Sequence, residues 1–180
     1  LTLGVAAIAA VQSVSSGLLE GLRADGGVLL GGDVAGRSVQ TPFSAEQLGW
    51  FAACSRLSQG AELRSMVRRG DEERSSLVEL KAVDGAYPLY GRIGLGDGTS
   101  EEVDPAGLAT TLAKRDGRWG AVIEPILAER LDLKVGDDLR LGDHVFELRA
   151  LLVHEPDKAS SGAFVLGPRM MVAFDSLAES

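Results

Sequence analysis

The side chains that could do chemistry in this sequence are few, and their spacing does not gather them into a site. His144 and His154 are the two histidines, and their separation fits no metal-ligand spacing. Each is more typical of a histidine at a strand edge than of a general base. Asp137 and Asp138 are neighbours in a turn, and adjacent side chains of an extended chain point apart. They are therefore poor candidates for a carboxylate dyad.

Other chemical motifs are missing as well. The serines have no Gly-x-Ser-x-Gly context, and without a Walker sequence any use of ATP belongs to another chain. The glycines of 94–102 do not match a phosphate cradle, and the carboxylates there lack the spacing of a calcium loop. Arg69-Gly70-Asp71 is more simply a hairpin tip than an adhesion tripeptide. We predict that the chain is not an enzyme and has no catalytic, cofactor-binding or metal-binding residues, and we assign no substrate-binding residue.

Composition restricts the partners. The chain has 180 residues, a net charge of −8 and a pI near 4.8, so its field repels phosphate backbones and nucleic acid is not an expected partner. Cys54 is the single cysteine, so no internal disulfide forms, which leaves the compartment open. Because it falls on a helix with apolar neighbours, we expect a packed core thiol.

The stretch from Leu131 to Pro156 contains the clearest structural pattern. A turn at 135–138 precedes Leu139 and Leu141, which alternate with a polar residue as in a half-buried strand. Gly142-Asp143 breaks that strand, and 145–153 resumes it with alternating apolar positions. The pattern predicts a β-hairpin, which needs a scaffold to cover its apolar face.

The remaining elements alternate between strands and helices, without an internal repeat. Ser44 is a predicted N-cap with Gln47 completing a capping box, and Asp104-Pro105 is predicted to open a helix that runs towards Ala113. The other predicted elements are strands at 28–39, 61–68, 76–83, 119–123 and 170–174, a flexible acidic loop at 94–102, a helix from Glu124-Pro125 to Leu131, and a last helix capped by Asp175. The pattern predicts an α+β fold.

The N-terminal stretch has two interpretations. Residues 1–14 carry no charged side chain, but a membrane-spanning helix needs roughly 20 apolar residues. The stretch is either an amphipathic helix packed on its own domain or the outer end of a transmembrane helix. Gly26-Gly27 is predicted to end this helix as a left-handed cap, with a hinge as the alternative.

Several stretches in order resemble the extracytoplasmic core domain of MacB/FtsX-type ABC transporter permeases, in particular their YbbP-like branch. They are Leu29-Leu30-Gly31-Gly32-Asp33, 77–84 with 86–91, 131–141, 146–152 and 164–169. The resemblance implies a two-lobed α+β domain. Residues 1–25 would end the first transmembrane helix, 26–84 and 158–180 would form a membrane-proximal α/β lobe, and 85–157 would form an inserted β-rich lobe. The chain would re-enter the membrane after Ser180.

The same resemblance implies a function. The domain would lie in the periplasm, attached to the inner membrane, and would couple ATP-driven movement of transmembrane helices to export or extraction of hydrophobic or lipid-like substrates. Its partners would be a cytoplasmic ATP-binding subunit, a second permease subunit and a periplasmic protein such as an esterase. The alternatives are a stand-alone extracytoplasmic module that binds a lipid or a protein, and a hydrolase with a dispersed site.

Overall fold

The computed structural model describes residues 12, 15, 26–27, 31–39, 41–70, 74–96, 101–158 and 167–178. The predicted end of a transmembrane helix at 1–25 therefore lies, apart from Gln12 and Ser15, outside the described residues. Gly26 and Gly27 are helical rather than left-handed, so the predicted cap at this pair is wrong, and the positive φ, 72°, belongs to Gly31. None of the helices in the described ranges has the length and apolar character that a membrane crossing requires.

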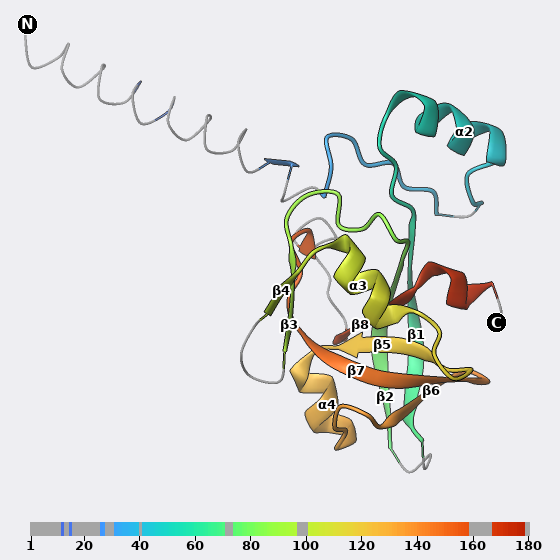
Figure 1. Ribbon diagram of the computed structural model, residues 1–180, viewed down its shortest axis with the longest axis vertical. Helices are drawn as coiled ribbons and strands as arrows, with labels where there is room; N and C mark the ends of the chain where they lie inside the picture. The colour runs from blue at the N-terminus through green and yellow to red at the C-terminus, as the bar shows by residue number, and fades with distance from the viewer. Residues whose placement is uncertain are drawn as a thin grey trace, which may run out of the picture.

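One mixed sheet organises the described part of the chain (Figure 1). Its order is β4-β3-β7-β5-β8-β2-β1-β6, and β6 also pairs with β7, so the strands from β7 round to β6 close on themselves. The strands are β1 (Gly60–Arg69), β2 (Ser75–Val83), β3 (Ile93–Gly96), β4 (Glu101–Val103), β5 (Trp119–Ile123), β6 (Asp138–Leu141), β7 (His144–His154) and β8 (Arg169–Ala173). The pairs β2–β8 and β5–β7 are parallel and the others are antiparallel. The predicted α+β class is confirmed.

The two predicted hairpins are present. β1 pairs with β2 from Gly60 opposite Val83 to Arg68 opposite Ser75, and β6 pairs with β7 across Gly142-Asp143. The turn that precedes β6 is held by Asp137, whose carboxylate accepts a 2.9 Å hydrogen bond from the backbone N–H of Lys134. This polar residue therefore fixes the turn that leads into β6, as the sequence indicated.

Two predicted elements are wrong, and so is the predicted cap of the last helix, because the 3-10 helix η2 (Phe174–Leu177) has Ala173 at its N-cap and Asp175 inside it. The described ends of the predicted loop at 94–102 are instead strand, because β3 pairs with β4 with Ile93 opposite Val103, while 97–100 lie outside the described residues. Burial of the Ile93 and Leu95 side chains stabilises this strand pair. The predicted strand at 28–39 is not a strand over its described part, 31–39, which is largely exposed.

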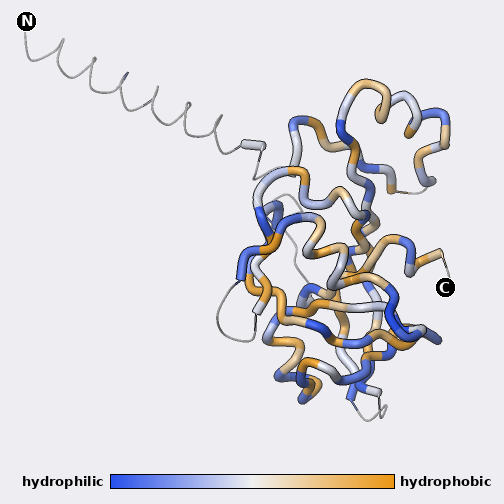
Figure 2. Tube along the Cα trace, viewed as in Figure 1, coloured by the Kyte–Doolittle hydropathy of each residue, from blue (hydrophilic) through white to orange (hydrophobic). Residues whose placement is uncertain are grey.

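The larger core lies inside the closed part of the sheet. Side chains from six strands meet there, among them Val78, Phe146 and Met170. Helix α4 (Pro125–Leu131) adds Leu127, Ala128 and Leu131. The 3-10 helix η2 (Phe174–Leu177) packs against the same core through its first and last residues. Figure 2 shows the same distribution, with hydrophobic segments along the strands and hydrophilic ones at many turns.

A second core lies on the outer face of the sheet. Helix α3 (Pro105–Leu112) begins at Asp104, whose carboxylate accepts from the Gly107 N–H at 2.8 Å, and buries Leu108 and Leu112. The helix lies so close to β5 that a Cβ on Gly120 would come within 2.1 Å of a helix carbonyl. Arg149 on β7 donates to the carbonyls of Thr111 and Ala113 at the end of α3, so the helix end is satisfied from the sheet.

Helix α2 (Ala45–Cys54) lies apart from the sheet (Figure 1). The predicted capping box is confirmed, with Ser44 and Gln47 exchanging side-chain to backbone hydrogen bonds. None of its residues is buried, and Cys54 is exposed. The prediction of a packed core thiol is therefore wrong: the apolar run makes a helix, but the helix does not reach a core.

The two predicted lobes are joined by strand pairing. β5 and β6 lie within 85–157, and they pair with β8 and β1, which lie within 158–180 and 26–84. The described strands thus form one continuous sheet, and the two-lobe arrangement itself is not confirmed.

Candidate functional site: a buried ion cluster

A group of charged side chains is buried on the outer face of the sheet, beside the second core. Lys81 on β2, Glu155 just after β7 and Arg169 at the start of β8 are 6%, 5% and 3% exposed. Tyr87 and Asp157 complete the group, which we call the ion cluster. It joins three separate stretches of chain at one place, because its members follow or occupy three different strands.

Lys81 is at the centre of the ion cluster. Its ammonium group donates to Glu155 at 2.7 Å, to Asp157 at 2.8 Å and to the Tyr87 hydroxyl at 2.9 Å. It also lies 4.3 Å from the centroid of the Tyr87 ring. An ammonium group has three donors, so each of them has an acceptor. Such complete pairing is what a charge needs in order to remain in a dry interior.

Glu155 connects the lysine to an arginine. While one carboxylate oxygen accepts from Lys81, the other accepts from Arg169 Nε at 3.0 Å. Two further carboxylates, of Glu62 and Glu79, lie 3.8 and 3.7 Å from the Arg169 guanidinium. Burial acts to lower the pKa of Arg169, but the surrounding carboxylates, Glu155 foremost, hold that pKa above its ordinary value. The guanidinium is therefore fixed in its charged form.

Tyr87 closes the ion cluster with a hydrogen bond of 2.5 Å from its hydroxyl to Asp157. Burial raises the pKa of this phenol far above its ordinary value, and the negative charges of Asp157 and Glu155 raise it further. Tyr87 therefore stays protonated, accepts from the lysine and donates to the aspartate. It serves as a neutral bridge and not as a general base.

The ion cluster contacts the N-terminal part of the described chain at Gly31. Gly31 lies so close to Asp157 that a Cβ on the glycine would be 3.0 Å from the Cβ and Oδ2 of the aspartate. Two residues further on, Asp33 accepts a 2.9 Å hydrogen bond from the hydroxyl of Tyr90. We call residues 31–39 the incoming segment. It packs against Asp157, at the point where the buried charges hold β2, β7 and β8 together.

A second ion pair extends this attachment to the next strand. Glu124 follows β5 and accepts from the backbone N–H of Arg169 at 2.9 Å, while its own N–H donates to the Arg169 carbonyl at 3.0 Å. The same carboxylate pairs with Lys158, whose side chain is about half exposed. The ends of four strands are thereby tied by charged side chains within one small region.

The chemistry available to this arrangement is structural. The charges of Lys81 and Arg169 balance those of Glu155 and Asp157, and each group is already engaged by another. Within the described ranges, no buried side-chain nitrogen or oxygen lacks a hydrogen-bond partner, and no set of three or more His, Cys, Asp or Glu is placed to hold a metal ion. The cluster is suited to clamping strands together.

The residues that sequence reasoning weighed for chemistry lie elsewhere and are not brought together. His144 and His154 are the first and last residues of β7, at opposite ends of an eleven-residue strand. Asp137 caps its turn, and Asp138 forms an ion pair with Arg118 at 2.8 Å. Of the Arg69-Gly70-Asp71 triplet, Asp71 lies outside the described residues.

The sequence analysis did not predict the ion cluster, although the sequence contains one sign of it. Lys81 lies between Leu80 and Ala82, in a run that is otherwise apolar up to Val83. A cation in a buried strand needs an anionic partner, and the Glu155-Pro156-Asp157 sequence after the longest strand offers two carboxylates. Nothing local indicates that these two stretches meet, because they are 74 residues apart.

No family model matches the chain, but its sequence is similar to that of a known protein. It is 26% identical over 174 residues to the uncharacterized ABC transporter permease YbbP of Escherichia coli strain K12, a match that covers 96% of this chain and 19% of the permease. The chain thus spans about a fifth of the length of the curated relative that it matches.

Two solved structures are similar to part of the chain. The extracellular domain of the noncanonic ABC-type transporter YknZ from Gram-positive bacteria has a TM-score of 0.47 and 18% identity, with 68% of this chain and 56% of that one covered. The periplasmic region of MacB from Actinobacillus actinomycetemcomitans has a TM-score of 0.44 and 7% identity, with 68% and 50% covered.

The match to the curated permease extends over all the stretches from which the likeness was inferred, because it includes nearly the whole chain. The resemblance that the sequence indicated to ABC transporter permeases, and in particular to YbbP, is therefore confirmed.

Proposed function

We propose that this chain is the extracytoplasmic domain of an ABC transporter permease subunit, and that it transmits movement of transmembrane helices to a step outside the membrane. The observation that carries the proposal is the similarity to the permease YbbP along 96% of the chain. The moved substrate would be hydrophobic or lipid-like, and the motor would be a separate ATP-binding subunit on the cytoplasmic side.

The ion cluster supports a role in transmission. A domain that passes on movement has to be stiff and firmly attached to the segment that moves. The incoming segment meets the cluster at Asp157, and the cluster holds the sheet through Lys81 and Arg169. Packed, fully paired groups shift between discrete arrangements and do not deform gradually. A displacement of the incoming segment would therefore reach the sheet with little loss.

The proposal assigns no bond chemistry to this domain. Its buried charges are engaged with one another, so they offer no free base or nucleophile to a substrate. Transport would then depend on other parts of the permease, on a second permease subunit and on the ATP-binding subunit. A periplasmic partner such as an esterase would act on what the transporter releases. The segment would lie in the periplasm, with the permease in the inner membrane.

The test uses the full-length permease that contains this domain, co-purified with its ATP-binding subunit and reconstituted in liposomes. The clamp is weakened by Lys81→Met, and the matched control is Lys158→Met, which removes a partly exposed lysine from the same region. Release of a fluorescent fatty-acid probe and hydrolysis of ATP are measured together. We expect the first variant to hydrolyse ATP while releasing several-fold less probe per ATP, and the control to behave as the unmodified transporter.

Three results would refute the proposal. The full-length protein could reach the same extracytoplasmic location without any ATP-binding subunit, which would favour a stand-alone binding module. The two lysine variants could release equal amounts of probe per ATP although Lys81→Met measurably loosens the domain. Finally, the isolated chain could turn over ester or glycoside substrates, which would identify it as a hydrolase.

A further inference from the structure

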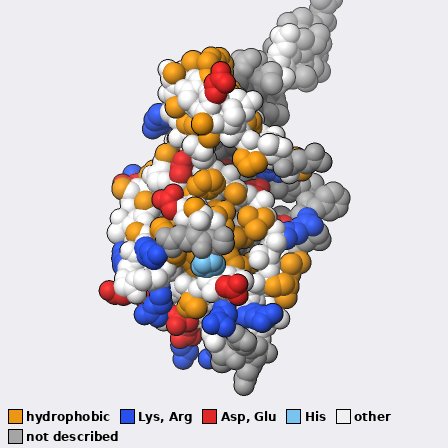
Figure 3. Space-filling model, turned by 90° about the vertical axis from the view of Figure 1, so that its right-hand side faces the viewer, with side chains coloured by type: hydrophobic (Ala, Val, Ile, Leu, Met, Phe, Trp, Pro, Cys, Tyr) orange, Lys and Arg blue, Asp and Glu red, His pale blue; other side chains and the backbone are white. Residues whose placement is uncertain are grey.

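The second half of helix α2 is an exposed run of apolar residues. Residues 49–54, Gly-Trp-Phe-Ala-Ala-Cys, include no charged, amide or hydroxyl side chain. No residue of the helix is buried, Trp50 is 65% exposed, and a Cβ on Gly49 would meet no atom within 4 Å. Figure 3 shows hydrophobic side chains at the surface of the uppermost part of the molecule, where α2 lies. An exposed run of this kind indicates a contact with something outside the domain.

Aromatic rings hold this apolar run in a fixed orientation. The rings of Phe43 and Phe51 are 6.1 Å apart and meet edge to face, and the Trp50 ring lies 5.3 Å from that of Phe51. A Cβ on Gly36 would be 3.6 Å from the Phe43 ring, so the aromatic rings also contact the incoming segment. Phe51 thus supports Trp50 from one side, while most of the indole remains exposed.

The charged side chains near α2 are engaged with other parts of the domain. Arg37 forms an ion pair with β1 at 2.8 Å, and Arg56 donates to a backbone carbonyl in the turn after β2 at 3.3 Å. Asp33 accepts from a tyrosine hydroxyl in the same turn. Residues 31–58 contain two acidic and two basic residues, so this part of the chain is neutral although the whole chain carries −8. Glu46, in the first turn, is the one charged residue of α2.

Helix α2 lies on the side of the domain from which the chain enters. In Figure 1, α2 and the incoming segment lie at one end of the described domain, and β1 runs from there towards the other end. Residues 1–14, which precede both, carry no charged side chain. In the proposed function the membrane lies on the side of these N-terminal residues. The exposed apolar run of α2 is then on the membrane side as well.

We propose that the second half of α2 docks on the lipid surface, an inference that rests on the proposed function for the presence of a bilayer. Trp50 would lie at the boundary between headgroups and acyl chains, where tryptophan is favoured because its ring is apolar and its N–H is polar. A helix of ten residues is too short to span a bilayer, which takes about 20, but it can lie in the interface. Glu46, one turn before Trp50, stays at headgroup level when the end of the helix is the deeper part.

A second copy of the chain fits this surface less well than lipid does. A stable protein interface buries about 800 Å² per partner, and one large aromatic side chain supplies about 150–250 Å². In the run 49–54 only Trp50 is both large and mostly exposed, because Phe51 is half-buried and the other members are small. Two copies would also repel each other, since each carries −8. A zwitterionic bilayer has no net charge and requires no matching shape.

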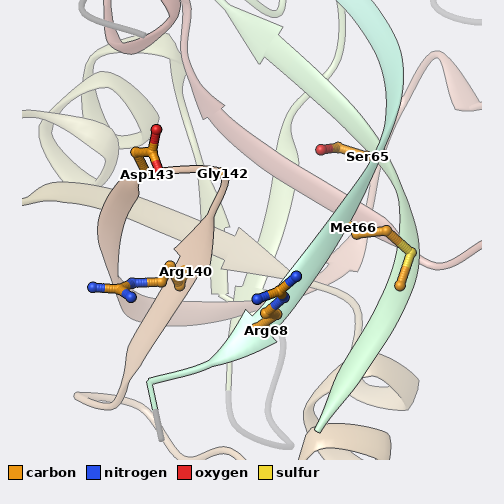
Figure 4. A pocket seen from close by; sticks show the side chains of 6 residues that line it. All are labelled: Ser65, Met66, Arg68, Arg140, Gly142 and Asp143. Carbon is orange, nitrogen blue, oxygen red and sulfur yellow. The ribbon is translucent and has the colours of Figure 1, made fainter. Parts of the chain in front are cut away.

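A depression elsewhere on the described surface is less suited to an apolar partner. It has a volume of about 350 Å³ and lies between β1 and β6, further along β1 from α2. Figure 4 shows the side chains around it, among them those of Ser65, Arg68, Arg140 and Asp143. These polar groups are well solvated in water, and transferring them to lipid would be costly. The apolar run of α2 has no such cost.

Two single-tryptophan variants test the docking. The chain has two tryptophans, so Trp119→Phe leaves Trp50 as the emitter, and Trp50→Phe leaves Trp119, which packs against the inner core. Each 180-residue variant is mixed with phosphatidylcholine vesicles whose acyl chains are brominated near the carbonyl end. Bromine quenches nearby indoles, and whatever else holds the chain at the bilayer is the same in both variants. We expect Trp50 emission to move to shorter wavelength and to be quenched several-fold more strongly than Trp119 emission.

Cys54, at the end of the apolar run, provides a second readout. Its exposed thiol should react with a water-soluble maleimide several-fold more slowly after phosphatidylcholine vesicles are added. Trp50→Glu places a charge in the run and should remove most of this protection. Gln47→Glu is the matched control, because it adds the same charge in the first half of the helix and a glutamate can still complete the capping box with Ser44. It should leave the protection unchanged.

Three results would overturn the docking. Both tryptophans could be quenched equally, or the chain could fail to float with the vesicles. Trp50 could also become shielded from iodide without lipid, increasingly with chain concentration, which would mean that a second copy covers α2. None of these measurements uses ATP. A failure of the coupling test with Lys81→Met would therefore leave the Trp50 result unchanged, and an absence of Trp50 quenching would leave the coupling test unchanged.

Discussion

Replacing Lys81 by methionine should destabilise the domain more than any other single lysine replacement on this face. Methionine keeps most of the aliphatic volume but removes the ammonium group that Glu155, Asp157 and Tyr87 share at 2.7–2.9 Å. The carboxylates of Glu155 and Asp157 would then lose their shared cation, and Glu155 would keep its contact with Arg169. Removing one partner of a buried ion pair costs about 3–5 kcal/mol. For a domain of this size that corresponds to a decrease in Tm of roughly 6–20 °C.

The assay is urea unfolding of the chain, followed by tryptophan fluorescence and far-UV circular dichroism so that two-state behaviour is checked by two probes. Lys158→Met is the matched control, because Lys158 also pairs with a carboxylate but its side chain is 47% exposed. An exposed pair contributes about 0–1 kcal/mol. A loss below about 1 kcal/mol for Lys81→Met, or one equal to the loss in the control, would show that the ion cluster does not hold the strands.

A second substitution separates two effects of Lys81→Met, the loss of its attraction to the carboxylates and the repulsion between the carboxylates that remain. Asp157→Asn alone should cost less than Lys81→Met, because Lys81 keeps Glu155 as a partner and asparagine still accepts a hydrogen bond. The double variant should be more stable than the sum of the two single losses predicts, since the second change removes one of the repelling carboxylates. Strict additivity would contradict the contact, because neighbours in one ion network are coupled.

Three further predictions concern Tyr87, Gly31 and Cys54. The pKa of Tyr87 is higher in the folded chain than its ordinary 10.0 in the unfolded one. Its contribution to stability is therefore complete below about pH 10 and declines above it. In urea titrations, Tyr87→Phe should reduce the alkaline loss of stability by about 1.4 kcal/mol per pH unit. Gly31→Ala should cost about 1–3 kcal/mol, through its φ of 72° and its contact with Asp157, whereas Gly85→Ala, which meets nothing within 4 Å, should stay within about 0.5 kcal/mol in the same assay. Cys54 should react with a maleimide in native buffer at a rate within about tenfold of that of the unfolded chain, since its thiol is exposed; a rate limited by unfolding would mean that α2 is covered.

Most of the strands and helices follow from local signals in the sequence. The capping residues Ser44 and Asp104 and the turn residue Asp137 act where their types predict, because each carboxylate or hydroxyl satisfies a backbone N–H within a few residues. Alternation of apolar residues was also sufficient to predict the strands β6 and β7. The short pair of β3 and β4 was missed because the acidic, glycine-containing sequence from 94 to 102 is typical of a loop. Its pairing comes from tertiary contacts.

Packing of whole elements was less predictable. An apolar run in a helix indicates burial, yet α2 buries nothing, and Cys54 is exposed with it. The periodicity of a sequence identifies the apolar face of a helix but not the surface that covers it. The closure of the sheet through β6 could not be predicted either. It depends on the pairing of β1 with β6, where Arg68 lies opposite Arg140, and these two strands are far apart in the sequence.

The ion cluster shows what kind of information a single sequence lacks. Its members lie in three stretches, and each stretch has an ordinary local explanation: a lysine in a strand, a tyrosine in a turn, acidic residues after a strand. Only the parallel pairing of β2 with β8 and the path of the chain after β7 bring the carboxylate of Glu155 within 2.7 Å of Lys81 and 3.0 Å of Arg169. The lysine embedded in an apolar run was the one local sign that partners had to exist.

The use of charges at this position bears on the function. Buried ion pairs are often no more stabilising than apolar residues of the same volume, because desolvation offsets the attraction. What they add is geometric selectivity: Lys81 satisfies its three acceptors only when the ends of β2 and β7 and the turn at Tyr87 are all in place. An apolar contact would tolerate a shift of the incoming segment, whereas this cluster penalises it. Selectivity of that kind is what the proposed transmission of movement requires, because the incoming segment, which packs against Asp157, would have to move the sheet as one body.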